Sequence, residues 1–113
     1  MRETNLILLA EDDDNDAFFI VRAFQKRQIL NPLQRVKDGE EAITYLKGEG
    51  KFADRKQFPL PLLMVMDLKM PRLSGFEVIA WVRQQPVIKR LPIVVLTSSP
   101  SFTRCSGLRI CRF

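Results

Sequence analysis

The 113-residue sequence contains no histidine, and its only two cysteines, Cys105 and Cys111, lie near the C-terminal end. Without histidine, the chain cannot itself carry a phosphohistidine. Two cysteines six residues apart match no metal-binding or redox spacing. No apolar run approaches the ~20 residues that a membrane span requires. The apolar residues 6–10 are too few, and too closely followed by acids, to form a secretory signal. We therefore predict a cytoplasmic protein that does not contact the membrane.

The net charge of +5 is distributed unevenly along the chain. All 13 acidic residues and 15 of the 18 basic residues lie within residues 1–99. The other three basic residues, Arg104, Arg109 and Arg112, lie in a segment that contains no acid. A basic excess can indicate a nucleic-acid partner. Here the excess comes from one short segment, so direct binding to nucleic acid is not expected.

Short apolar runs alternate with amphipathic stretches along residues 1–99, which is typical of β-α-β units around a parallel sheet. Buried strands are predicted at residues 6–10, 33–36, 62–66 and 92–96, and helices at residues 15–28, 40–46 and 76–85. Three aromatic residues on these helices are assigned to the core: Phe18, Phe24 and Phe76. One of residues 12–15, with Asp14 or Asn15 favoured, is expected to cap the first helix, because Asp and Asn favour that position.

The alternating pattern ends at Ser99. Residues 100–113 show no clear periodicity and contain no acidic residue. We therefore predict one incomplete domain at residues 1–99, followed by an atypical tail at residues 100–113. A sheet of four strands needs at least one more strand and helix to cover the open side of the fourth strand, and the tail does not supply them by its pattern.

Polar residues follow three of the predicted strands. Glu11, Asp12 and Asp13 follow the first strand, Asp67 follows the third, and Thr97 follows the fourth. In open α/β sheets, ligands bind at the carboxyl ends of the strands. Carboxylates gathered there repel one another unless a cation lies among them, and Mg²⁺ prefers carboxylate and phosphate oxygens. The pattern therefore predicts phosphoryl transfer assisted by Mg²⁺, with the Thr97 hydroxyl as a hydrogen-bond donor.

Three ordered motifs resemble those of response-regulator receiver domains: ILLAEDD at 7–13, VMDLKMPRLSG at 65–75 and IVVLTSS at 93–99. The KDGEEA turn at 37–42 and the long loop at 48–61 are similar to those of stand-alone receivers, including the receivers that serve bacterial phytochromes. The resemblance covers residues 5–99. It implies a doubly wound α/β fold with a parallel sheet, flavodoxin-like receiver topology and strand order 2-1-3-4-5.

The resemblance also implies roles for individual residues. Asp67 would be the phosphoacceptor, and Thr97 would be the switch hydroxyl that moves toward the phosphoryl group. Glu11 and Asp12 would bind Mg²⁺ together with Asp67 and the backbone carbonyl of Lys69. Pro71 and Gly75 shape the loop that follows the acceptor.

The sequence departs from this family after Ser99. The family's Lys at the end of a fifth strand has no counterpart, because no lysine follows Lys89. The last strand with its switch aromatic, and the fourth and fifth helices, are missing as well. One alternative therefore stays open, that the chain is a non-functional receiver fragment with a frame-altered tail. Such a fragment would expose apolar surface and self-associate.

The main prediction is a phosphoacceptor receiver of a two-component signalling system, with Mg²⁺ as its cofactor. A partner histidine kinase or phosphotransfer protein would supply the phosphoryl group, and the output would be a surface offered to another protein. The chain is not expected to be an enzyme beyond gaining and losing its own aspartyl phosphate. A phosphatase of the haloacid dehalogenase type ranks last, because Lys69 stands where such enzymes need a second Asp.

Overall fold

The computed structural model describes residues 5–67, 75–98 and 108–112. Within these ranges the strands are β1 (Ile7–Ala10), β2 (Leu33–Val36), β3 (Leu63–Asp67), β4 (Ile93–Ser98) and β5 (Leu108–Arg112). The helices are α1 (Asp14–Lys26), α2 (Gly39–Lys47) and α3 (Gly75–Arg83), with a short 3₁₀ helix η1 (Gly50–Phe52). None of the described helices is long and apolar enough to cross a membrane.

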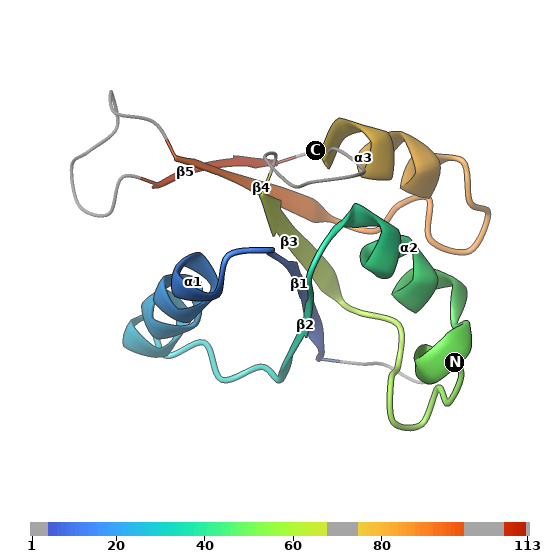
Figure 1. Ribbon diagram of the computed structural model, residues 1–113, viewed down its shortest axis with the longest axis horizontal. Helices are drawn as coiled ribbons and strands as arrows, with labels where there is room; N and C mark the ends of the chain where they lie inside the picture. The colour runs from blue at the N-terminus through green and yellow to red at the C-terminus, as the bar shows by residue number, and fades with distance from the viewer. Residues whose placement is uncertain (1–4, 68–74, 99–107, 113) are drawn as a thin grey trace.

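The strands form one sheet in the order β2-β1-β3-β4-β5 (Figure 1). The first four strands are parallel, with β1 between β2 and β3 and with β4 beyond β3. Because parallel strands end at the same edge, Ala10, Val36 and Asp67 close three neighbouring strands at one edge of the sheet. The predicted doubly wound parallel fold and its strand order are confirmed.

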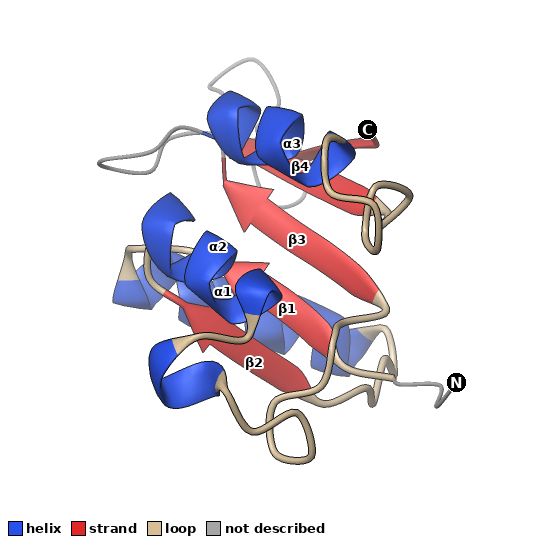
Figure 2. Cartoon of the chain, turned by 90° about the vertical axis from the view of Figure 1, so that its right-hand side faces the viewer, coloured by secondary structure: helices blue, strands red, loops and turns tan. Residues whose placement is uncertain are grey.

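Helices cover both faces of the sheet, α1 on one face and α2 with α3 on the other (Figure 2). Alternation along β1 explains the division, since successive side chains of a strand point to opposite faces. Leu8 and Ala10 pack in the core under α2 and α3, whereas Ile7 and Leu9 pack in the core under α1. The apolar runs of the sequence are therefore strands buried on both faces.

Two of the three aromatic residues assigned to the core lie at the surface. Phe18 is 56% exposed and Phe76 is 59% exposed, while Phe24 is partly buried against the core beneath α1. Helical phase explains the error. The inward stripe of α1 is Ala17, Ile20, Val21 and Phe24 at spacings of three and four residues, and Phe18 lies one position off that stripe.

The tail contains one strand that its sequence pattern did not indicate. The segment β5 pairs with β4 in antiparallel fashion, with Ser98 opposite Leu108 and Val94 opposite Arg112. The sequence of β5 contains no glycine or proline, and it begins with apolar and charged residues in alternation. Both features are compatible with a strand at the edge of a sheet. A parallel fifth strand and a helix after β4 are both absent from the part of the chain that the structure describes.

Candidate functional site

Glu11 directly follows β1 and is the only charged side chain buried within the described residues, with 1% of its surface exposed. Its backbone N–H donates to the Val36 carbonyl at 3.0 Å, which extends the pairing of β1 with β2 by one residue. Its side-chain Oε2 accepts a hydrogen bond from the Asp13 N–H at 3.1 Å. The end of β1 therefore holds this carboxyl group below the surface at the carboxyl edge of the sheet.

Three carboxyl groups meet at this edge, those of Glu11, Asp16 and Asp67. One oxygen from each lies within 4.8 Å of the others. Asp67 is the last residue of β3, the strand beside β1, and Asp16 lies in the first turn of α1. Oxygens bound to one Mg²⁺ ion lie up to about 4.2 Å apart, and those around Ca²⁺ somewhat further. The three groups therefore fit the coordination sphere of one divalent cation after a small contraction.

Burial and like charges shift the protonation of these groups. The pKa of Glu11 is raised from its usual 4.5 to about 8, chiefly by burial and in part by the carboxyl groups of Asp67 and Asp16, while the hydrogen bond from the Asp13 N–H lowers it. Burial also raises the pKa of Asp16, with smaller contributions from Asp13, Asp67 and Asp12. Crowded carboxyl groups of this kind either hold a proton or need a cation.

The loop between β1 and α1 is held at both of its ends. Asp13 caps α1, because its Oδ1 accepts from the Asp16 N–H at 3.0 Å. A cap within residues 12–15 is therefore confirmed, and it is Asp13 rather than Asp14 or Asn15. The Asp14 carboxylate instead pairs with Arg35 of β2 at 2.8 Å, and this hydrogen bond lowers the pKa of Asp14.

The structure brings together Glu11 and Asp67 from the predicted set and adds Asp16, which the sequence analysis missed. Asp16 lies five residues after Glu11, and only the turn from β1 into α1 brings it back over the end of β3. Asp12 is exposed and is not part of the described carboxylate cluster. The metal-binding role assigned to Asp12 stays a prediction.

Thr97 lies in β4, one residue beyond Leu96, which pairs with Asp67. Its backbone is therefore next to the acceptor strand at the same edge of the sheet, as the spacing predicted. The switch role of its hydroxyl stays a prediction. Lys69 and Pro71 lie outside the described residues, and so does the predicted carbonyl ligand.

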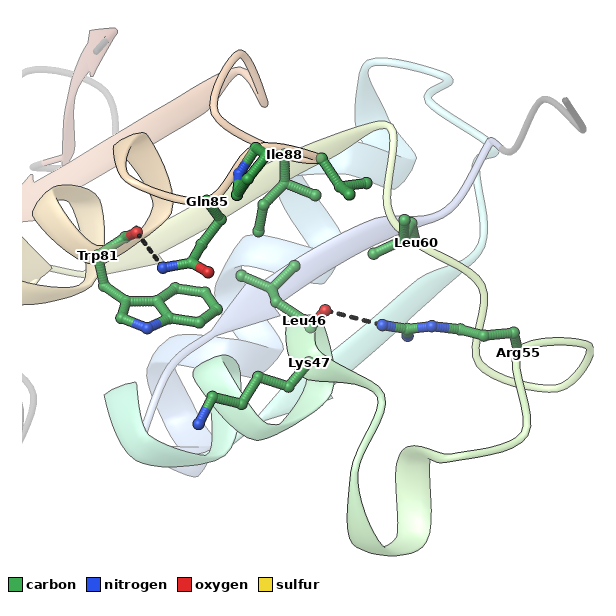
Figure 3. Close-up of a pocket in the computed structure, with 9 residues that line it drawn as sticks. Leu46, Lys47, Arg55, Leu60, Trp81, Gln85 and Ile88 are labelled. Carbon is green, nitrogen blue, oxygen red and sulfur yellow. Dashed lines mark hydrogen bonds between the residues drawn. The ribbon is translucent and has the colours of Figure 1, made fainter.

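A separate hollow of about 280 Å³ lies between the C-terminal ends of α2 and α3 (Figure 3). Leu46 and Lys47 of α2 line one side, and Trp81 of α3 with Gln85 and Ile88 lines the other. Both helices run away from the carboxyl edge of the sheet, so this hollow is at the opposite end of the molecule. It shares no residue with the carboxylate cluster.

A doubly wound sheet with carboxyl groups at the ends of β1 and β3 defines an α/β protein with an acidic site at its carboxyl edge. The sequence pattern of the response regulator receiver domain matches residues 7–108. The chain belongs to this family, whose members are the receiver domains of two-component signalling.

Two curated relatives give the scale of the similarity. The probable methanogenesis regulatory protein FilR2 of Methanothrix harundinacea is 32% identical over 99 residues, and the response regulator Rcp1 of Synechocystis is 35% identical over 94 residues. These matches cover 85% and 83% of this chain, but only 59% and 62% of the relatives. The chain thus spans about three fifths of the length of each of these two relatives.

Solved structures of the same kind superpose well. The phosphorylated cyanobacterial phytochrome response regulator RcpA has a TM-score of 0.75 and 35% identity, with 87% of this chain and 68% of that chain covered. The Mn²⁺-bound form of Rcp1 has a TM-score of 0.73 and 34% identity, with 85% and 67% covered. The similarity to these solved structures therefore agrees with the assignment of the chain to the receiver family.

Proposed function

We propose that the chain is a phosphoacceptor receiver that takes a phosphoryl group on Asp67 from a partner histidine kinase or phosphotransfer protein. The observation that carries this proposal is the meeting of Glu11, Asp16 and Asp67 at the carboxyl edge of a receiver sheet. One related structure is that of a phosphorylated response regulator, which supports the same chemistry here. A kinase partner fits a chain that has no histidine of its own.

The residues present suit a divalent cation, because oxygen donors surround a buried carboxyl group whose pKa is raised. We propose that Glu11 and Asp67 hold Mg²⁺, with Asp12, Asp16 and the Lys69 carbonyl as further ligands. A bound cation supplies charge neutralisation for the transferred group. Rcp1, a relative, has been solved in an Mn²⁺-bound form, which supports a divalent cation at this site.

The chemistry assigned to the chain is in-line attack. A carboxylate oxygen of Asp67 donates an electron pair to the phosphorus of the phosphohistidine. The O–P bond forms as the N–P bond breaks, and the imidazole nitrogen of the donor keeps that electron pair. The product is an acyl phosphate on Asp67, which water later hydrolyses. The chain needs no other catalytic activity for this cycle, and Thr97 offers a hydroxyl to the phosphoryl oxygens.

We assign this function to residues 1–99 and no separate output activity to residues 100–113. The output is a surface offered to another protein, and self-association remains a prediction. The predicted cytoplasmic location also stays a prediction.

The test is phosphorylation with acetyl phosphate and Mg²⁺, followed by intact mass measurement. Wild-type protein should gain one phosphoryl group that alkali or hydroxylamine removes, and Asp67→Asn should gain none. Asp54→Asn is the matched control, because Asp54 is exposed in the loop before β3 and lies outside the cluster. A phosphoryl group that persists in Asp67→Asn would refute the acceptor. A folded wild-type protein that gains none would favour an inactive receiver.

A further inference from the structure

Arg35 lies on β2, at the edge of the sheet, and contacts the loop that carries the proposed cation ligands. Its Nε donates to the Glu11 carbonyl oxygen at 3.0 Å, and its Nη1 donates to Asp14 Oδ1 at 2.8 Å. These two contacts enclose the short segment that contains Asp12 and Asp13. One guanidinium group therefore fixes both ends of the β1–α1 loop.

We propose that Arg35 is a positioning residue that holds this loop in its cation-binding form, an inference that rests on the proposed function. The Glu11 backbone has its N–H bonded to Val36 and its carbonyl bonded to Arg35. With both peptide groups fixed by β2, the Glu11 side chain is directed toward Asp67. Rotation of the carbonyl would turn the buried carboxyl group away from the cluster.

The contacts of Arg35 also affect the position of Asp16, through the start of α1. Arg35 holds Asp14 at the first position of α1, and Asp13 caps the N–H of Asp16 from the preceding position. Loss of the two Arg35 contacts would release both the start of α1 and the residue that follows β1. Two of the three clustered carboxyl groups then lose their fixed positions.

The positive charge of Arg35 opposes cation binding, whereas a positioning role favours it. Removal of Arg35 should therefore change the affinity for the cation in opposite directions under the two interpretations. A positive charge close to the cluster repels a divalent cation. If Arg35 acted only by its charge, or only as a surface ion pair, its removal would strengthen cation binding or leave it unchanged. A positioning role predicts weaker binding after the same removal. The Nη2 atom of Arg35 is buried and has no hydrogen-bond partner among the described residues, so the contacts that hold the guanidinium there are those of Nε and Nη1.

The test is Mg²⁺ titration by calorimetry of Arg35→Gln against Lys37→Gln. Lys37 is two residues further along, is exposed, and donates no side-chain hydrogen bond to the loop among the described residues, so its substitution removes the same charge without the clamp. Arg35→Gln should weaken Mg²⁺ binding about 10-fold, as loss of a group that orients metal ligands typically does. Lys37→Gln should bind as tightly as wild type or more tightly.

A third variant, Arg35→Lys, keeps the charge and loses the guanidinium fork. It should bind Mg²⁺ more weakly than wild type, although the net charge is unchanged, and it decides the question if Arg35→Gln does not fold. Circular dichroism without cation checks folding for each variant. Wild-type affinity in Arg35→Lys, or equal behaviour of Arg35→Gln and Lys37→Gln, would overturn the positioning role. Absence of Mg²⁺ binding by wild type itself would instead refute the proposed cation site.

Discussion

The carboxyl group of Glu11 lies beside that of Asp67 at the carboxyl edge of the sheet, with one oxygen of each within 4.8 Å of the other. Two carboxyl groups this close repel each other when both are ionised, which favours a proton on one of them. Burial assigns the proton to Glu11, whose pKa rises to about 8. In the absence of a cation, this pair is therefore neutralised in part by a proton at physiological pH, and a bound cation has to displace that proton.

The cation-free protein should become less stable as the pH rises from about 4.5 to about 8. In this window the folded state keeps the Glu11 proton and the unfolded state loses it, so stability falls by up to ~1.36 kcal/mol per pH unit. Below pH 4.5 the contribution is fully present. Urea unfolding at several pH values should show a steeper fall for wild type than for Glu11→Gln. Equal slopes for the two proteins would show that Glu11 ionises normally.

Cation affinity should change in the opposite direction and rise with pH toward 8. Mg²⁺ needs the ionised Glu11, so binding below pH 8 releases close to one proton. Calorimetry in two buffers of different ionisation enthalpy counts that proton. Glu11→Gln should release none and should bind more weakly at every pH. Proton release that persists unchanged in Glu11→Gln would assign the proton to another group.

Asp16 should contribute to cation affinity although the sequence motif does not include it. Asp16→Asn removes one of three clustered carboxylates and should weaken Mg²⁺ binding about fivefold, or ~1 kcal/mol, near the upper end for an exposed charge pair. Asp54→Asn removes the same charge from an exposed loop residue outside the cluster. Its effect should be smaller. Equal losses in both variants would indicate a general effect of charge rather than a ligand.

The sequence predicted the parallel sheet well because its strands are buried on both faces and therefore read as continuous apolar runs. It also predicted that Glu11 and Asp67 meet, since both directly follow strands that lie side by side. It missed Asp16 because that residue returns to the site only through the angle at which α1 leaves the loop. The helical phase of Phe18 and Phe19 was ambiguous for a similar reason, because several apolar residues in a row fit more than one face.

The tail was harder to predict than the body. Residues 108–112 carry only a weak strand signal, and their direction depends on pairing with β4 rather than on their own pattern. A β-strand of five residues gains its order from the neighbour that it pairs with. The sequence therefore showed that the receiver pattern ends after Ser99, but it could not show that an antiparallel strand takes the position beside β4.

The register of that strand leads to the last prediction. Arg109 pairs with Thr97 near the carboxyl end of β4, whereas Arg112 pairs with Val94 three residues away from it. Cα atoms opposite each other in antiparallel strands lie about 4.5–5.5 Å apart. The backbone of Arg109 is therefore beside the residue predicted to contact the phosphoryl group, and the chain has no lysine after Lys89 to offer there.

A cation that reaches the phosphoryl oxygens forms charge-assisted hydrogen bonds and lowers the barrier to transfer. Removing a preorganised donor typically costs about 10²–10³ in rate. We expect a smaller effect here, so Arg109→Ala should slow phosphorylation by acetyl phosphate about 10-fold. Arg112→Ala removes the same charge from the same strand and should leave the rate close to that of wild type. Initial rates of phosphoryl incorporation at fixed Mg²⁺ distinguish the two variants. Equal slowing would mean that β5 acts through the stability of the sheet edge, and no slowing in either would exclude Arg109 from the reaction.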